Sequence, residues 1–228
     1  MGEKTGRTTV LCVGNPMLAR PTRKVAIGNG DEFRSAVRDV EVLTEVLRGS
    51  RGVGLAANQV GISKSIAVLE DLTVRDDERL LDKGLETLPL VQMINPVITN
   101  RSAEVIVHME GCLSIPGLYC FVERHDSVTV EWTNAGGEKM RKEFRGWPAR
   151  IVQHEVDHLD GIVISQKAVK GILIGEYEYR EFWREMSPME IIKQLGADRE
   201  EGLRSATPRV VERTHTEMCQ VADWFTVE

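Results

Sequence analysis

The sequence predicts an α+β fold in which short antiparallel strands pack around a central helix. Two observations predict it. Amphipathic helical patterns stand near the start and in the second half of the chain, and the segments between them are mostly short, strand-like and separated by turn residues. The chain shows no regular alternation of strand and helix, which is the pattern that builds a parallel sheet.

The first helix is predicted over residues 31–49. Asp31 stands before the apolar pattern as a candidate N-cap, and Gly49 follows it, as is typical of a helix end. The apolar residues that recur at helical spacing are Phe33, Val37, Val40, Leu43 and Leu47. We therefore expect one face of this helix to lie in the core.

The middle of the chain alternates turns and strands. Residues 52–61 are rich in glycine and predict a turn, and residues 65–70 predict a short strand. The charged segment 73–87 is expected to be an exposed insertion loop. Residues 91–99 predict a strand with a break at Pro96, because proline cannot donate to a strand ladder.

A hairpin and a second helix follow. Residues 127–133 and 138–144 flank the turn sequence Asn-Ala-Gly-Gly, which predicts an antiparallel hairpin. The next helix admits Pro148 in its first turn and ends at Gly161, and we place this helix at the centre of the fold. Near the C-terminus, the segment 187–196 has a capping-box pattern and predicts a last helix.

Length and composition describe one ordinary globular domain. The chain has 228 residues, of which 42% are hydrophobic, and its net charge is −6. We expect no direct recognition of nucleic acid by an acidic chain of this size, no membrane segment, no secretory signal, and free thiols at its four cysteines. We expect residues 1–165 to carry the functional site, and residues 166–228 to be a C-terminal helical extension of the same domain with no assigned function.

The stretch QHEVDH, residues 153–158, carries the most specific chemistry. Residues four apart on a helix lie on one face, so His154 and His158 aim at the same point and Glu155 flanks it. In such an H-E-x-x-H arrangement two imidazoles hold a divalent metal, and the glutamate handles the proton of an attacking water. The alternative is a helix with two ordinary histidines.

A catalytic metal needs a third protein ligand and one open position. The candidates are Cys112, Cys120, His108, Glu110 and His125. Cys112 stands out because Gly111 and Gly117 predict a tight loop that can fix its thiol and turn the Leu113 N–H toward the same spot. The alternative for Cys112 is a small buried apolar residue, the commonest fate of a free cysteine.

Three segments stand in a specific order and spacing: GVGLAANQ (52–59), EGCLS (110–114) and QHEVDHLDG (153–161). Together they resemble the signature motifs of the peptide deformylase family, and the resemblance covers residues 10–165, with features of the eukaryotic organellar branch. It implies a hydrolase that removes the formyl group from the N-terminal formyl-methionine of nascent polypeptides.

The resemblance also implies a ligand set. Cys112, His154 and His158 would bind one divalent metal, Fe²⁺ natively, with Zn²⁺, Ni²⁺ or Co²⁺ able to take its place. A thiolate ligand makes such a site softer and, with Fe²⁺, sensitive to oxygen.

The implied catalytic residues are Glu155, as general base and acid, and Gln59 with the Leu113 backbone N–H, as an oxyanion hole. Gly52 and Gly54 would shape the turn that presents Gln59. Residues expected to contact the substrate are Gly52, Val53, Gly54, Gly111, Trp147 and Ile151.

Two departures from the family pattern leave details open. Asn58 stands where the family usually has proline, which concerns the rigidity of the Gln59 loop. Trp147 and Arg150 replace aliphatic residues common in bacterial members, which concerns the shape of the methionine pocket. The expected partners are N-formylmethionyl nascent peptides, with the ribosome as a further candidate. The expected location is a mitochondrial or plastid matrix, or the cytoplasm if the chain is bacterial.

Three alternatives stay open. An H-E-x-x-H metallopeptidase would need a ligand further along the chain, where His215 is the only histidine. GVGLAA also fits a dinucleotide-binding pattern, but it follows a predicted helix rather than a strand. A catalytically impaired deformylase-like binding protein would keep the fold without turnover.

Overall fold

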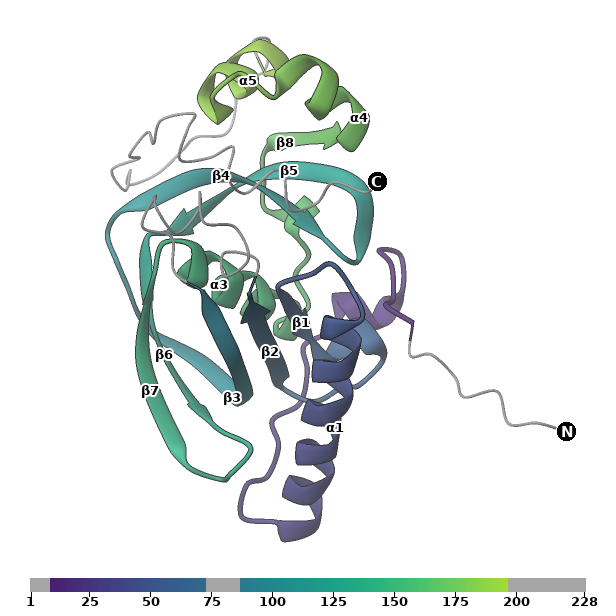
Figure 1. Ribbon diagram of the computed structural model, residues 1–228, viewed down its shortest axis with the longest axis vertical. Helices are drawn as coiled ribbons and strands as arrows, with labels where there is room; N and C mark the ends of the chain where they lie inside the picture. Colours follow the sequence, from purple (N-terminus) through teal and green to yellow (C-terminus); the bar gives the residue numbers. More distant parts are fainter. Residues whose placement is uncertain (1–8, 73–86, 197–228) are drawn as a thin grey trace, which may run out of the picture.

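The computed structural model describes residues 9–72 and 87–196, and Figure 1 shows how their helices and strands are arranged. Two antiparallel sheets form the core, with strand orders β1-β2-β3-β6-β7 and β4-β5-β8. The strands are β1 (Gly54–Ala56), β2 (Ile66–Asp71), β3 (Leu88–Arg101), β4 (Val105–Cys112), β5 (Ile115–His125), β6 (Ser127–Thr133), β7 (Lys139–Arg145) and β8 (Ala168–Gly175). The helices are η1 (Pro16–Ala19), α1 (Gly30–Arg48), η2 (Ala57–Val60), α3 (Trp147–Leu159), η4 (Ile164–Gln166), α4 (Glu176–Glu178), η5 (Tyr179–Trp183) and α5 (Pro188–Leu195).

Helix α3 contacts strands of both sheets, so the predicted α+β fold with antiparallel strands around a central helix is confirmed (Figure 1). Its apolar residues Ala149, Ile151 and Val152 are buried against Trp132 and Phe144 of the β6–β7 hairpin. Removing this much apolar surface from water fixes the helix rigidly, which suits an element that has to hold metal ligands.

The cap of the first helix lies two residues before the predicted one. The Asn29 side chain, not that of Asp31, accepts hydrogen bonds from the backbone N–H groups of Asp31 and Glu32 and so caps α1. Asp31 lies in the first turn instead, where its charge favours the positive end of the helix. Gly49 ends the helix as predicted, and the buried residues of α1 are Ala36, Val40, Leu43, Thr44 and Leu47.

Residues 52–61 are not the simple turn that their glycines predict. They contain the short strand β1 and the 3₁₀ helix η2, and both elements are almost entirely buried. The backbone of β1 pairs with β2, and this pairing places Gln59 beside the central helix rather than on a surface loop. Glycine here serves close packing more than chain reversal.

Strand β3 does bend at the predicted break. Asn95, the residue before Pro96, has a φ of 56°, and the register with β6 shifts between Ile94 and Val97. The Asn95 side chain holds the bulge by bonding both the N–H and the carbonyl of Val25, each at 2.8 Å. The strand continues beyond this bulge and is not interrupted.

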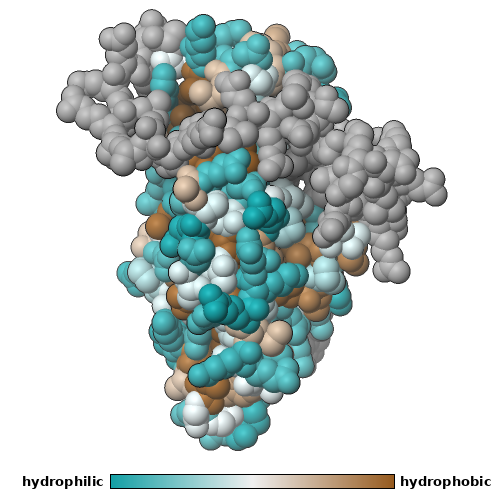
Figure 2. Space-filling model, turned by 90° about the vertical axis from the view of Figure 1, so that its left-hand side faces the viewer, coloured by the Kyte–Doolittle hydropathy of each residue, from teal (hydrophilic) through white to brown (hydrophobic). Residues whose placement is uncertain are grey.

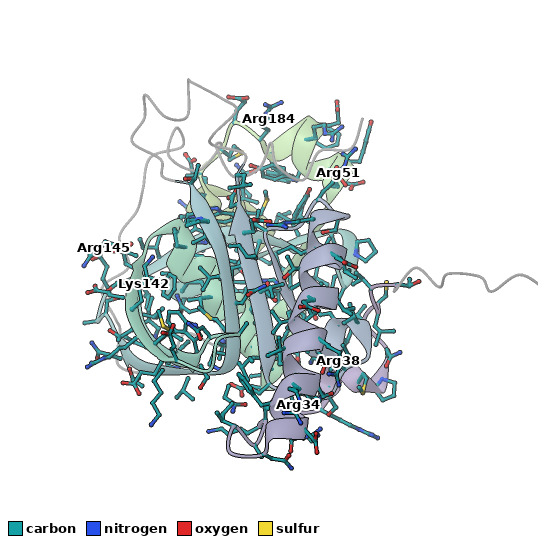
Figure 3. All side chains as sticks on the ribbon, turned by 60° about the horizontal axis from the view of Figure 1, so that its bottom comes forward. Arg34, Arg38, Arg51, Lys142, Arg145 and Arg184 are labelled. Atoms are coloured by element: carbon teal, nitrogen blue, oxygen red, sulfur yellow. The ribbon has the colours of Figure 1, made fainter. Side chains whose placement is uncertain are left out.

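The predicted hairpin is present as β6 and β7, and Gly137 supplies the positive φ of 86° that its turn needs. Strand β7 is the edge of its sheet, and Lys142 and Arg145 extend outward from it (Figure 3). The face of the molecule that carries this hairpin is mostly hydrophilic in Figure 2. A charged edge of this kind discourages pairing with another chain.

Both later helices begin and end near the predicted residues. Pro148 lies in the first turn of α3, and Gly161 follows its end with a φ of 76°. A Cβ at Gly161 would lie 2.8 Å from the backbone of Arg20, so only glycine fits there. Ser187 and Glu190 form the predicted capping box of α5.

The part of the chain after residue 165 starts with strand β8, which pairs with β5, before the short helices and α5. Residues 73–86, most of the predicted insertion loop, and residues 197–228, with His215, lie outside the described residues. Within 9–72 and 87–196, no helix is both long and apolar enough to cross a membrane.

Candidate metal centre

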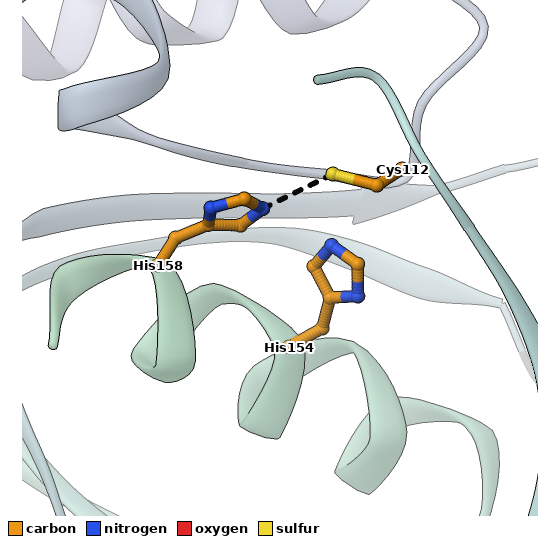
Figure 4. Close-up of side chains that lie close together, drawn as sticks. All are labelled: Cys112, His154 and His158. Carbon is orange, nitrogen blue, oxygen red and sulfur yellow. Dashed lines mark hydrogen bonds between the residues drawn. The ribbon is translucent and has the colours of Figure 1, made fainter. Parts of the chain in front are cut away.

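Two elements bring three potential metal ligands together. His154 and His158 project from successive turns of α3 with ring centroids 5.0 Å apart, and Cys112 is the last residue of β4 (Figure 4). Their ligand atoms all lie within 4.8 Å of one another, and Cys112 Sγ is 3.2 Å from His158 Nε2. One thiol and two imidazoles at this separation suit a tetrahedral divalent metal that keeps one position open.

The turn at Cys112 is tighter than the sequence suggests. Cys112 pairs directly with Ile115, so only Leu113 and Ser114 form the turn, and Gly117 already lies within β5. The backbone N–H of Ser114 lies 3.4 Å from Cys112 Sγ, and this contact helps to hold the sulfur in place.

The other third-ligand candidates do not join this cluster among the described residues. Glu110 binds Arg124, with two contacts of 2.9 Å, and His125 Nδ1 lies 2.7 Å from the carbonyl of Ser102. Cys120 is fully buried, and burial raises its pKa to about 12, so its thiol stays protonated.

His154 is oriented by a buried ion-pair network. Its Nδ1 lies 3.1 Å from Glu110 Oε2, and the Arg124 guanidinium links Glu110 to Asp157 on the same helix. Burial opposes the charge of Glu110, but Arg124 and His154 together hold its pKa well below the usual value. Glu110 therefore accepts the Nδ1–H of His154 and leaves Nε2 for the metal.

His158 sits in a different environment. Burial and the neighbouring His154 hold its pKa well below the usual value, so its ring is neutral and able to act as a ligand. Its Nε2 faces Cys112, whereas its Nδ1 is buried and has no hydrogen-bond partner among the described residues.

Glu155 lies beside the ligands and forms no ion pair with any of the described residues. Burial raises its pKa to about 7, and its Oε2 is buried without a hydrogen-bond partner in the described part of the chain. A Cβ at Gly54 would lie 2.3 Å from Glu155 Oε1, so the carboxylate occupies space that only glycine leaves. Likewise a Cβ at Gly52 would lie 2.7 Å from Leu113 Cδ1. The predicted role of these glycines in shaping a turn is thus replaced by a role in close packing.

Gln59 is held tightly next to Cys112. Its Oε1 accepts the backbone N–H of Ala56 at 2.8 Å, and its Nε2 lies 3.2 Å from Ser114 Oγ and 3.8 Å from Cys112 Sγ. These contacts aim the amide N–H₂ group toward the metal ligands, as an anion-stabilising donor requires.

A cavity of about 500 Å³ opens beside the ligands. All six residues predicted to contact a substrate line it, together with Gln59, Leu113, Cys112, His154 and Glu155. Three further lining residues, Met109, Glu110 and Arg150, were not among the predicted substrate contacts. The sequence had linked Arg150 only to the shape of the methionine pocket, and it lies one helical turn before His154 on the same face. It donates to the Met109 carbonyl at 2.8 Å, and its guanidinium lies 5.1 Å from the Trp147 ring.

Comparison of this sequence with those of known proteins finds clear relatives. Residues 8–171 match the family model described as polypeptide deformylase. Peptide deformylase 1 of Streptomyces coelicolor is 34% identical over 193 residues, which are 84% of this chain and 87% of that protein. Peptide deformylase 1A of Arabidopsis thaliana, chloroplastic/mitochondrial, is 35% identical over 74% of this chain and 65% of its own length.

Solved structures of peptide deformylases are also similar to this chain. A class I type b peptide deformylase from Acinetobacter baumannii with bound Met-Ala-Ser has a TM-score of 0.60, with 32% identity, over 69% of this chain and 97% of that one. Peptide deformylase from Thermotoga maritima has the same TM-score with 31% identity, over 71% of this chain and 97% of that one.

Proposed function

The chain belongs to the peptide deformylase family of hydrolases, and from this premise we propose that it removes the formyl group from the N-terminal formyl-methionine of nascent polypeptides. The observation that carries the proposal is the convergence of Cys112, His154 and His158 beside the buried carboxylate of Glu155, next to a cavity. Metal-assisted hydrolysis of an amide needs metal ligands, a proton carrier and room for the acyl group; the three ligand residues, Glu155 and the cavity supply them.

Cys112, His154 and His158 would hold one divalent metal, Fe²⁺ in the native enzyme, and Zn²⁺, Ni²⁺ or Co²⁺ would also fit the soft donor set. When bound, the metal polarises the formyl carbonyl and lowers the pKa of water at the site. The hydrogen bond between Glu110 and His154 Nδ1 supports this set of metal ligands, because it fixes the imidazole ring with Nε2 toward Cys112.

Glu155 carries the proton. With a pKa of about 7 its carboxylate takes a proton from the attacking water and returns it to the leaving amine at neutral pH. The close approach to Gly54 holds this carboxylate at the edge of the cavity, where the scissile bond would lie.

Gln59 and the Leu113 backbone N–H stabilise the negative charge that develops on the formyl oxygen. The side chain of Gln59 is fully buried and fixed at its other end by Ala56, so little reorganisation is needed during reaction. Losing one donor of this kind typically costs about 2.7–4 kcal/mol of transition-state stabilisation.

The methionine side chain would lie in the part of the cavity lined by Val53, Met109, Trp147, Arg150 and Ile151. A relative of this chain was solved with Met-Ala-Ser bound, which is the sequence of a deformylated peptide. We propose that Gly52, Gly54 and Gly111 contact the peptide backbone. Formyl carries only hydrogen on its carbonyl carbon, so a narrow site can reject larger acyl groups by size.

All of these residues lie between positions 52 and 158, so we propose that residues 1–165 contain the whole catalytic site and that residues 166–228 are an extension of the same domain. The enzyme would act where translation starts with formyl-methionine, which is a mitochondrial or plastid matrix or a bacterial cytoplasm. Relatives of both origins support either location. We also propose that the enzyme contacts the ribosome, where its nascent substrates emerge.

The proposal is tested by anaerobic purification, quantification of bound metal, and turnover of formyl-Met-Ala-Ser beside unformylated Met-Ala-Ser. We expect about one metal per chain, as three ligands and one open position imply, and release of formate from the formylated peptide only. Internal cleavage of longer unformylated peptides would indicate a metallopeptidase. Metal binding without any turnover would indicate a deformylase-like binding protein.

A further inference from the structure

The two histidines of the metal centre are supported unequally. The ring of His154 has the Glu110 carboxylate at its Nδ1. The ring of His158 is 1% exposed, and its Nδ1 has no hydrogen-bond partner among the described residues. Because Nε2 of His158 faces Cys112 and must be free of a proton to bind metal, Nδ1 carries the proton and is a buried donor. A buried donor without an acceptor is destabilising, because it loses its hydrogen bonds to water and gains none in return.

Asn58 contacts His158 from outside the metal site. It is 1% exposed, and its Nδ2 donates a hydrogen bond to the backbone carbonyl of His158. Its Oδ1 is a buried acceptor with no hydrogen-bond partner in the described part of the chain. A buried donor and a buried acceptor thus both lack a partner among the described residues, on two residues that already share a hydrogen bond.

We propose that Asn58 is a positioning residue for His158: Nδ2 holds the histidine carbonyl, and Oδ1 accepts the ring Nδ1–H through one bridging water molecule. This deepens the proposed function and rests on it, since it assigns the support of one metal ligand. A buried water typically satisfies about three polar groups of this kind, and metal-binding histidines are usually supported at their second nitrogen.

Glu155 Oε2 is another buried acceptor without a hydrogen-bond partner among the described residues, but it is a poorer candidate acceptor for the His158 ring. Glu155 lines the cavity, where its carboxylate is needed for proton transfer, whereas neither Asn58 nor His158 belongs to the cavity wall. Asn58 also precedes Gln59, so one short helix, η2, would position both a metal ligand and the oxyanion donor.

The test uses the full chain loaded anaerobically with Co²⁺, whose visible absorption reports the ligand geometry. Asn58→Leu removes both hydrogen-bonding groups with little change in volume, and Asn58→Pro introduces the residue usual in the resembled motif. Both variants should release Co²⁺ to excess EDTA about 10–100-fold faster than the wild type, as loss of an outer-shell partner typically does. Their Co²⁺ absorption bands should shift as the ring loses its fixed orientation.

Thr22→Val is the matched control. The Thr22 hydroxyl donates to the carbonyl of Leu159, the next residue of the same helix end, at 3.0 Å, so this variant removes a comparable bond without touching His158. It should release Co²⁺ at the wild-type rate. The inference is overturned if both Asn58 variants stay within roughly twofold of the wild type, or if Thr22→Val accelerates release equally. A wild-type chain that takes up no Co²⁺ overturns the proposed function and this inference together.

Discussion

Glu110 and Glu155 are the two buried glutamates of the metal centre, 6% and 3% exposed, and their direct contacts differ. Glu110, on β4, lies against the Arg124 guanidinium and the His154 ring, which outweigh burial and keep it ionised. Glu155, on α3, lies beside Gly54 and forms no ion pair among the described residues, so burial dominates and raises its pKa to about 7. Similar burial therefore produces a fixed structural charge in one place and a proton carrier in the other, because in the described part of the chain only Glu110 has an ion-pair partner.

The largest expected effect separates these roles directly. Glu155→Gln keeps the shape of the side chain but cannot carry a proton, so turnover of formyl-Met-Ala-Ser should fall by about 10²–10⁴-fold. Metal content should stay at the wild-type value. Glu181→Gln, at an exposed position of η5, is the control and should behave as the wild type. A Glu155→Gln enzyme with ordinary turnover would rule out the proposed proton carrier.

The partner of Glu110 should matter mainly for stability. Arg124→Met leaves the buried charges of Glu110 and Asp157 without their cation and should lower the free energy of unfolding by about 3–5 kcal/mol. Arg141→Met breaks an exposed pair with Glu131 and should cost less than about 1 kcal/mol. Urea unfolding of the metal-free proteins measures the loss of unfolding free energy in both variants. Similar losses would mean that the buried ion-pair network stabilises the protein no more than the exposed pair does.

The two carboxylates should also give pH dependences of opposite sign in the metal-free protein. The raised pKa of Glu155 favours the folded state below the usual value of 4.5, and this advantage is lost as pH rises toward about 7. It amounts to at most about 3 kcal/mol. The lowered pKa of Glu110 favours the folded state above 4.5 and is lost as pH falls through its folded value.

Unfolding free energies across these two pH ranges separate the contributions. Glu155→Gln should flatten the profile between pH 4.5 and 7, and Glu110→Gln should flatten it below 4.5. The assignment of partners is wrong if the two substitutions alter the same range.

The smallest expected effect concerns the glycine that makes room for Glu155. Gly54→Ala places a methyl group 2.3 Å from Oε1 and should displace the carboxylate, with a loss of about 100-fold in kcat. Gly28→Ala, where a Cβ meets nothing within 4 Å, is the matched control. Unchanged kcat in Gly54→Ala would show that the carboxylate needs no such exact placement.

Much of the fold follows from local patterns. The spacing of apolar residues located α1 and α3, and turn residues located the β6–β7 hairpin and the capping box of α5. The cap of α1 was misplaced because Asn29 and Asp31 are both good caps, and the choice depends on the direction from which the chain enters the helix. The glycines at 52 and 54 were misread because their reason is a neighbour distant in sequence.

The sequence by itself determined that His154 and His158 share a face, because helical geometry fixes side chains four residues apart. It also determined the family, through three motifs whose order is a property of the chain. The resemblance also favoured Cys112 among five candidate ligands, and the tertiary structure brought its sulfur to both rings. Only the tertiary structure joined Arg124 to Glu110 and set Asn58 beside His158. These contacts span 14 to 100 residues and depend on how two sheets close around one helix, which no local pattern encodes.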